Sequence, residues 1–194
     1  MIYLTSDLHL CHDKDFLYGK RGFDNIYAHN NKIIKNWNSI VQPEDDVYVL
    51  GDIMLNDSQT GISLLKQLKG NIHIIRGNHD SDNRILLYKE CDNVVEVCDA
   101  KWLKVGKQSF FLSHYPCITS NLDEDKPLNK RIVNLCGHSH YQNKFKDMDK
   151  GLIYHVELNA HNCKPISIEE IIKDIKTFIS LDKNAQKRLC ENDI

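Results

Sequence analysis

The sequence has no apolar stretch that approaches the roughly 20 residues a helix needs to cross a lipid bilayer. Its first residues, MIYLTSDLHL, lack a basic start and reach Asp7 too early for a secretory signal peptide. Internal repeats, low-complexity segments and linker-like stretches are absent as well. We therefore expect a cytoplasmic protein that does not associate with a membrane.

Cysteine pairs of the CxxC type are also absent, although the chain contains seven cysteines. An odd number of cysteines without paired spacing argues against a disulfide framework and against a zinc site built from thiolates. The pattern is typical of free thiols in a reducing compartment, which agrees with a cytoplasmic location.

A basic stripe is missing too, because the 25 Lys and Arg residues are spread along the chain and the formal net charge is −2. Proteins that bind long DNA or RNA usually carry a positive patch, so the charge argues against long nucleic acid as a partner. At 194 residues, 41% of them hydrophobic, the chain is long enough to bury one core. We expect a single domain over residues 1–194, with a loose polar tail over 182–194.

Short apolar runs alternate with helical patterns in the first half of the chain. MIYLT, DVYVLGD and NIHIIRGNHD are predicted to form strands, and apolar residues recur with helical spacing over residues 30–41 and 58–69. In the second half, strands follow one another with little helix between them, over NVVEV, KWLKV, QSFFLSH, RIVNLCGHSH and LIYHVEL. The pattern predicts an α/β protein with parallel strands first, a second sheet of mixed direction, and helices outside. Ser167, followed by Glu170, predicts the capped start of a last long helix.

Metal-binding types of side chain follow the predicted strands at the points where the strands end. These side chains are Asp7, His9, Asp52, Asn78, His114, His138 and His140. The carboxyl ends of parallel strands meet at one edge of a sheet, where loops build ligand sites. Seven nitrogen and oxygen donors exceed the three or four that one zinc ion needs. The number suits two divalent ions that share a bridging carboxylate, an arrangement that binds a phosphoryl group.

The spacing of these donors has a physical reason. In Asp7-x-His9 and His138-x-His140, alternate side chains of an extended segment project to the same side and can reach the same ion or adjacent ions. Gly51 precedes a donor residue at a strand end, where a tight backbone suits the absence of a Cβ atom. Any one of these residues alone is more often a cap or a surface side chain, so their combination carries the hypothesis. Imidazole and carboxylate donors without thiolates suit borderline or harder ions.

The order of these blocks is similar to the signature of calcineurin-like metallophosphoesterases. D-x-H, G-D, G-N-H-D, a lone His and G-H-x-H occur in that order between residues 7 and 140. Two shorter stretches resemble small bacterial and phage members of the family. KRGFDN is similar to their R-P-F segment, with Gly22 in place of proline, and CKPISIEEI resembles the segment that opens their last helix.

The resemblance implies a four-layer α/β/β/α sandwich of two mixed sheets flanked by helices. It also implies two divalent ions, with Mn, Fe, Zn and Ni as candidates, and Asp52 as the ligand that bridges them. The first ion would bind Asp7, His9, Asp52 and His140. The second ion would bind Asp52, Asn78, His114 and His138.

The same resemblance implies a phosphoesterase reaction. A hydroxide activated by both ions would attack phosphorus, His79 would donate a proton to the leaving oxygen, and Asp80 would orient the imidazole of His79. Arg76 and Arg21 are candidates for contacts with substrate. The expected substrate is a small phosphate ester, a phosphodiester or a small phosphomonoester. Two alternatives stay open: a catalytically weak metal-binding scaffold of the same fold, and a nuclease that acts on short oligonucleotides.

Overall fold

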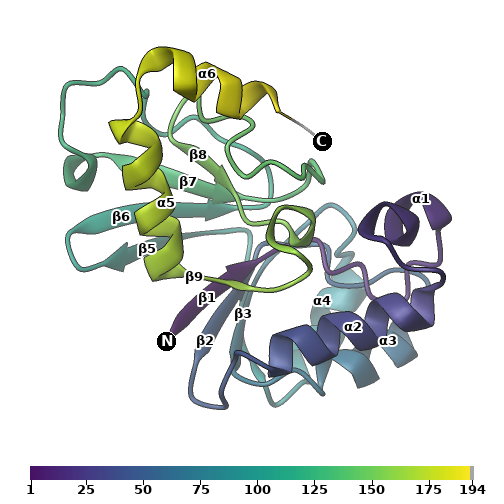
Figure 1. Ribbon diagram of the computed structural model, residues 1–194. Helices are drawn as coiled ribbons and strands as arrows, with labels where there is room; N and C mark the ends of the chain where they lie inside the picture. The colour runs from purple at the N-terminus through teal and green to yellow at the C-terminus, as the bar shows by residue number, and fades with distance from the viewer. Residues whose placement is uncertain (193–194) are drawn as a thin grey trace.

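The computed structural model describes residues 1–192, in which two sheets pack against each other with helices on both sides (Figure 1). The first sheet has five strands in the order β4-β3-β2-β1-β9. Strands β1 to β4 are parallel to one another, and β9 pairs with β1 in the antiparallel direction. The strands are β1 (Ile2–Thr5), β2 (Asp46–Val49), β3 (Asn71–Ile75), β4 (Val94–Cys98) and β9 (Ile166–Ser167).

The second sheet has four strands in the order β5-β6-β7-β8. The hairpin of β5 and β6 is antiparallel, whereas β6, β7 and β8 are parallel. The strands are β5 (Ala100–Val105), β6 (Gln108–Ser113), β7 (Ile132–Cys136) and β8 (Ile153–His155). Both sheets are therefore mixed and flanked by helices, which confirms the predicted fold class.

Helices α2 (Ile26–Asn38), α3 (Ser58–Leu65) and α4 (Asp82–Lys89) lie together on one side of the first sheet (Figure 1). Two of them start at a side chain that accepts a backbone N–H, Asn25 for α2 and Asp57 for α3. The fully buried indole of Trp37 belongs to the core that these helices form with Val47 and Val49 of β2. This packing fixes the first sheet and the loops at its carboxyl edge.

A second core fills the space between the two sheets. Side chains two residues apart on a strand share a face, and on β6 and β7 that face is apolar. The members from these strands are Phe110, Leu112, Val133 and Leu135. Helix α5 (Ile168–Ser180) adds an apolar stripe at helical spacing, with Ile168, Ile171, Ile175 and Phe178 buried in the same core.

Helix α5 begins with the predicted capping box. Ser167 accepts the backbone N–H of Glu170, and the carboxylate of Glu170 accepts the backbone N–H of Ser167. Two backbone donors at the helix start are thereby satisfied by side chains. The cap follows β9 directly, so it also fixes where α5 leaves the edge of the first sheet.

The predicted loose tail is wrong for most of its length. Residues Lys183–Glu191 form helix α6, which starts at the side chain of Asp182 and buries Cys190. The side chain of Asn143 donates to the carbonyl of Leu189, so the end of the helix is bonded to the body of the protein. The sequence did not predict this helix, because its composition is polar and its single buried side chain leaves almost no hydrophobic pattern. Residues 193–194 lie outside the described part of the chain.

Four short elements complete the described part of the chain. They are α1 (Asp15–Tyr18) and the 3₁₀ turns at Gly19–Arg21, Leu128–Lys130 and Leu158–His161. No helix in residues 1–192 is both long and apolar enough to span a membrane. The parallel strands of both sheets bring their carboxyl-terminal loops to one region between the sheets, where the candidate site lies.

Candidate metal centre

Loops from five strands bring all seven predicted donor side chains together. Asp7 and His9 follow β1, Asp52 follows β2, Asn78 follows β3, His114 follows β6, and His138 and His140 follow β7. The donors come from both sheets, so the two sheets must pack correctly before the site exists. The donors fall into two groups that meet at one carboxylate.

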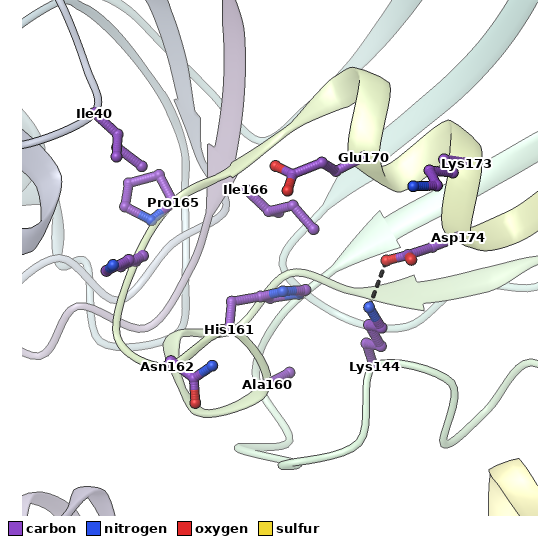
Figure 2. A pocket seen from close by; sticks show the side chains of 11 residues that line it. Ile40, Lys144, Ala160, His161, Asn162, Pro165, Ile166, Glu170, Lys173 and Asp174 are labelled. Atoms are coloured by element: carbon purple, nitrogen blue, oxygen red, sulfur yellow. Dashed lines mark hydrogen bonds and ion pairs between the residues drawn. The ribbon is translucent and has the colours of Figure 1, made fainter.

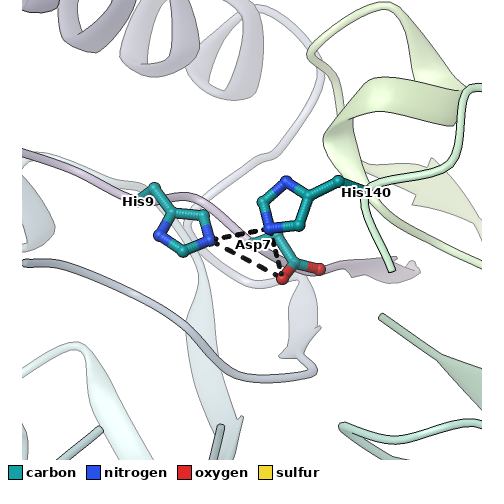
Figure 3. A group of neighbouring side chains, drawn as sticks. All are labelled: Asp7, His9 and His140. Atoms are coloured by element: carbon teal, nitrogen blue, oxygen red, sulfur yellow. Dashed lines mark hydrogen bonds and ion pairs between the residues drawn. The ribbon is translucent and has the colours of Figure 1, made fainter. Parts of the chain in front are cut away.

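The first group consists of Asp7, His9 and His140 (Figure 3). Oδ1 of Asp7 lies 3.5 Å from Nε2 of His140 and 3.8 Å from Nε2 of His9. The two imidazole nitrogens lie 3.1 Å apart. Two histidines and a carboxylate thus point their donor atoms at a common position.

The second group consists of Asn78, His114 and His138. Oδ1 of Asn78 lies 2.8 Å from Nε2 of His114 and 2.9 Å from Nδ1 of His138. The other nitrogen of His114, Nδ1, lies 2.7 Å from the carbonyl oxygen of Leu50 and donates to it. This bond fixes the tautomer, so Nε2 of His114 carries the free lone pair that a metal ligand needs.

Asp52 lies between the two groups. Its Oδ2 atom lies 3.6 Å from Nε2 of His9 in the first group and 3.7 Å from Nε2 of His114 in the second. Its Oδ1 atom accepts the backbone N–H of His79 at 2.9 Å. One carboxylate oxygen is therefore shared by both groups, and the other holds the loop that follows β3.

The alternation of donors in the sequence predicted extended segments, but the structure shows that the donor segments are not extended. Five of the seven donors have a left-handed backbone, with φ of +58° at Asp7, +48° at His9, +56° at Asp52, +75° at His138 and +55° at His140. Strand β1 ends at Thr5, before the first of them. Left-handed backbone costs free energy in residues other than glycine and collects at functional sites. The side chains converge because the backbone turns at each donor.

Two glycines give these turns the space they need. A Cβ atom on Gly77 would collide with the carboxylate of Asp52, and one on Gly137 would collide with Ser6 and the carboxylate of Asp7. The backbone of one donor loop packs directly against the carboxylate of another. Side chains larger than hydrogen at these positions would force the donors apart.

The buried polar atoms of the site fit divalent cations. Oδ1 of Asp7 is buried and has no hydrogen-bond partner in residues 1–192, while Oδ2 accepts from Ser6 and from the backbone of His138. A buried carboxylate oxygen without a partner costs free energy unless a cation balances it. The orphaned oxygen faces His9 and His140, where an ion would bind.

The electrostatics of the metal-free site favour neutral imidazoles. Burial lowers the pKa of His9 to about 3, although Asp7 opposes the shift. Burial also lowers the pKa values of His138 and His140. Metal binding requires unprotonated imidazole, so these three side chains are in the ligand form at neutral pH.

Asp80 is not placed to orient His79, which corrects the prediction from the resemblance. Its carboxylate is buried and accepts three backbone N–H groups, from Asp52 at 2.8 Å, Ile53 at 3.2 Å and Gly77 at 2.9 Å. The hydroxyl of Tyr88 donates to the same carboxylate at 2.7 Å. Asp80 therefore fixes the backbone that carries Asp52, and the imidazole of His79 is left without its support.

Arg21 also has a structural role in place of the expected contact with substrate. Its guanidinium donates to the carbonyl oxygens of Asp7 at 2.7 Å and Leu8 at 3.3 Å, and to Oδ1 of Asn159 at 3.0 Å. These bonds hold the segment after β1 in place. They also use the N–H groups of the guanidinium that would otherwise bind a phosphate. Arg76 is half-exposed; it donates to the carbonyl of Asp80 and pairs with Asp82 at 2.7 Å.

Glu157 supports the site and was missed by the sequence reasoning. Its buried Oε1 atom accepts the backbone N–H groups of Ser139 at 2.9 Å and His140 at 3.1 Å, which fixes the loop that carries two donors. His155 contacts the same carboxylate and also Asp147, at 3.0 Å. Burial alone would lower the pKa of His155, but its hydrogen bonds to Asp147, Cys136 and Glu157 raise it to about 12. An acidic residue at the end of β8 was the only sequence signal.

His12 and His79 complete the surroundings. Nδ1 of His12 lies 3.2 Å from Nδ1 of His9, so His12 contacts a candidate donor from behind. The ring of His79 is 41% exposed, and its Nε2 atom lies 3.9 Å from Oδ2 of Asp52. His79 thus lies beside the donor groups and faces the solvent.

The fold and the donor set define an α/β protein with a candidate metal centre between two mixed sheets. The family model of the calcineurin-like phosphoesterase superfamily domain matches residues 1–156. The chain therefore belongs to this superfamily, as the motif order indicated.

Individual proteins are similar to this chain in sequence or in structure. An uncharacterized protein of Methanocaldococcus jannaschii is 33% identical over 178 residues, which cover 90% of this chain and 91% of that protein. The Gene 66 protein of Mycobacterium phage L5 is 26% identical over 161 residues, which cover 71% of this chain and 76% of that protein. The crystal structure of a protein of unknown function from Aquifex aeolicus is similar with a TM-score of 0.68 and 26% identity, covering 89% of this chain and 98% of that one.

The role of Asp80 predicts a stability effect that does not depend on metal. Asp80→Asn replaces one acceptor oxygen by an N–H donor that faces other donors, so we expect a loss of about 1–3 kcal/mol in the free energy of unfolding. Urea denaturation in the presence of a chelator measures this loss. Tyr88→Phe is the matched control, because it removes one donor from the same carboxylate and leaves three. Unchanged stability in Asp80→Asn would contradict the role.

The charge of Asp52 predicts a pH-dependent stability in the metal-free protein. Burial, together with the charges of Asp7 and Asp80, raises the pKa of Asp52 from 3.8 to about 6, although His114 opposes the shift. The charged carboxylate therefore costs stability above pH 6, and this cost disappears as the pH falls toward 3.8. With chelator present, Asp52→Asn should be more stable than wild type at pH 8, by about 1–3 kcal/mol.

The same comparison at a pH near 4 provides the control, because the two proteins should then be equally stable. Denaturant titrations at both pH values measure the difference. A variant that is less stable than wild type at pH 8 would show that Asp52 stabilises the fold without metal.

Proposed function

We propose that this protein hydrolyses small phosphodiesters, and that it does so with two divalent ions. The observation that carries the proposal is the position of Asp52, whose Oδ2 atom lies 3.6 Å from His9 and 3.7 Å from His114. A single carboxylate oxygen between two separate donor groups suits a bridging ligand. Membership of a phosphoesterase superfamily supports the same reaction class.

Seven side chains would hold the ions, four for each ion with Asp52 in common. The first set is Asp7, His9, Asp52 and His140, and the second is Asp52, Asn78, His114 and His138. Imidazole, carboxylate and amide donors accept Mn, Fe, Zn or Ni, so supply in the cell would decide which ion binds. When bound, such ions lower the pKa of a water molecule toward about 7 and neutralise charge on phosphoryl oxygens.

His79 is proposed as the proton donor to the leaving group. Its backbone is held on both sides, since its N–H donates to Asp52 at 2.9 Å and its carbonyl accepts from Arg84 at 2.7 Å. Its ring nitrogens have no hydrogen-bond partner in residues 1–192, and the ring is 41% exposed. In the hydrolysis, the oxygen of water bonds to phosphorus, the ester P–O bond breaks, and the leaving oxygen takes the proton from His79.

The size and charge of the site favour small substrates. The cavity beside His9, His79 and His140 has a volume of about 410 Å³, within the range of sites for small molecules. A scaffold protein without activity would not need an exposed imidazole at this position. The net charge of −2 gives no general attraction for long nucleic acid.

Variants of His79 test the proposal. A general acid contributes roughly 10²–10⁴-fold, and its benefit follows the basicity of the leaving oxygen. His79→Ala should therefore lose much more activity on an alkyl or nucleoside diester than on bis-p-nitrophenyl phosphate, whose leaving group departs without a proton. Initial rates with manganese, and their loss on chelation, measure both effects.

Elemental analysis of His79→Ala is the control, because the variant should keep all of its metal. Equal losses on both substrates would show that His79 positions phosphate, and loss of metal would show that it is a ligand. A wild-type protein that holds metal but cleaves neither diester would contradict the proposal, and a further failure on phosphomonoesters and short oligonucleotides would favour the scaffold.

A further inference from the structure

The cavity beside the donor groups has two different walls. One wall carries His9, His79 and His140 from the candidate metal centre. The second wall comes from α1 and the 3₁₀ turn that follows it, with Phe16, Leu17 and Lys20. The first wall is polar and holds the proposed chemistry. The second wall has no part in that chemistry, so its composition calls for a separate explanation.

Phe16 is the unusual member of the second wall. Its apolar side chain is 63% exposed, although it lies at the edge of a cavity. The ring meets His12 edge to face, with 6.0 Å between the centroids, and His12 in turn contacts His9. An exposed aromatic ring at the edge of a site loses contact with water when a flat ligand stacks on it. Phe16 thus offers a stacking surface close to the candidate metal centre.

The wall that carries Phe16 is fixed in place. Leu17 is buried, and Arg21, at the end of the same segment, donates to the carbonyls of Asp7 and Leu8. Gly22 ends the segment with a left-handed backbone, φ +79°, that other residues rarely adopt. A pre-formed surface spends little free energy on ordering when a ligand binds.

Lys20 adds a positive charge to this wall. Its side chain is exposed and has no ion-pair partner among residues 1–192. A second cavity, of about 420 Å³ beside α5, is different, because the carboxylates of Glu170 and Asp174 line it and no Phe, Tyr or Trp is among its described lining residues (Figure 2). Of these two cavities, the one at the metal centre presents an unpaired cation beside an exposed aromatic ring.

We propose that α1 forms a subsite for the alcohol component of the substrate, and that this component carries a planar ring which stacks on Phe16. Lys20 contributes attraction for the phosphate of the same substrate. The volume of about 410 Å³ accommodates a ring together with a sugar, which makes a nucleoside ester the expected substrate class. The inference rests on the proposed function, since it assigns the leaving-group side of the same site.

Binding of phosphonates that cannot be hydrolysed tests the subsite without turnover. The probes are methylphosphonate, phenylphosphonate and the methylene phosphonate analogue of adenosine monophosphate, each titrated into the manganese-loaded protein by calorimetry. Stacking of a base on an aromatic ring corresponds to roughly 5- to 150-fold in affinity. We expect the adenosine analogue to bind more tightly than methylphosphonate by a factor in this range.

Variants of the wall separate stacking from charge. Phe16→Ala should remove most of the preference for the adenosine analogue and leave methylphosphonate within twofold, whereas Phe16→Tyr should keep the preference. Lys20→Gln should weaken all three probes alike. Tyr27→Ala is the matched control, because Tyr27 is an exposed aromatic residue, 77% accessible, that does not line the cavity.

Two results would overturn the inference: equal affinity of wild type for the adenosine analogue and methylphosphonate, or an equal loss for both in Phe16→Ala. A preference for phenylphosphonate alone would support the stacking surface and reject the nucleoside as its ligand. The proposed hydrolysis is judged separately, since these titrations give their result whether or not any diester is cleaved.

Discussion

Two carboxylates, Asp7 and Asp52, are buried side by side where the loops of both sheets meet, and the rest of the site is arranged around this negative charge. Asp7 is fully buried and Asp52 is 2% exposed, and within the described part of the chain no lysine or arginine forms an ion pair with either carboxylate. A folded protein tolerates such charge only if cations or hydrogen bonds compensate it. Oδ1 of Asp7 has no hydrogen-bond partner among residues 1–192. The lowered pKa values of His9, His138 and His140 keep these imidazoles neutral at pH 7, so divalent ions suit the site as counter-charge.

The surrounding residues act mainly on the backbone of the donor loops. Asp80 accepts the backbone N–H groups of Asp52 and Ile53. Glu157 accepts those of Ser139 and His140. Arg21 donates to the carbonyl oxygens of Asp7 and Leu8, which follow β1. Each of these three side chains fixes a segment in which a donor has a left-handed backbone. Strained backbone of this kind persists only where the surrounding structure holds it in place. Here the hydrogen bonds of charged side chains hold it. The bonds of Arg21 also hold the segment that carries α1, whose exposed Phe16 lines the cavity beside the candidate metal centre.

The sequence was sufficient to predict eight of the nine described strands and the convergence of the seven candidate donors, because both leave strong local patterns, whereas the two-residue strand β9 was missed. Apolar runs that end in Asp, Asn or His located five of the loops at the site. The geometry within the loops could not be predicted, since Asp and His only occasionally adopt left-handed backbone and the residue type alone does not show that Asp7 or His138 does. The role of Asp80 was misassigned because the sequence shows only that it is next to His79. In the structure, the carboxylate of Asp80 accepts the backbone N–H groups of Asp52 and Ile53, which are 28 and 27 residues away. Helices α4 and α6 were missed because few of their side chains are buried.

The most direct test of the account is the number of metal ions per chain in wild type and in Asp52→Ala. Elemental analysis of protein loaded with manganese and then freed of excess metal supplies both numbers. If Asp52 bridges two ions, wild type should hold two ions per chain, and Asp52→Ala should lose more metal than Asn78→Ala or His140→Ala, each of which removes a ligand from one ion. A single ion in wild type that persists in Asp52→Ala would contradict the shared site.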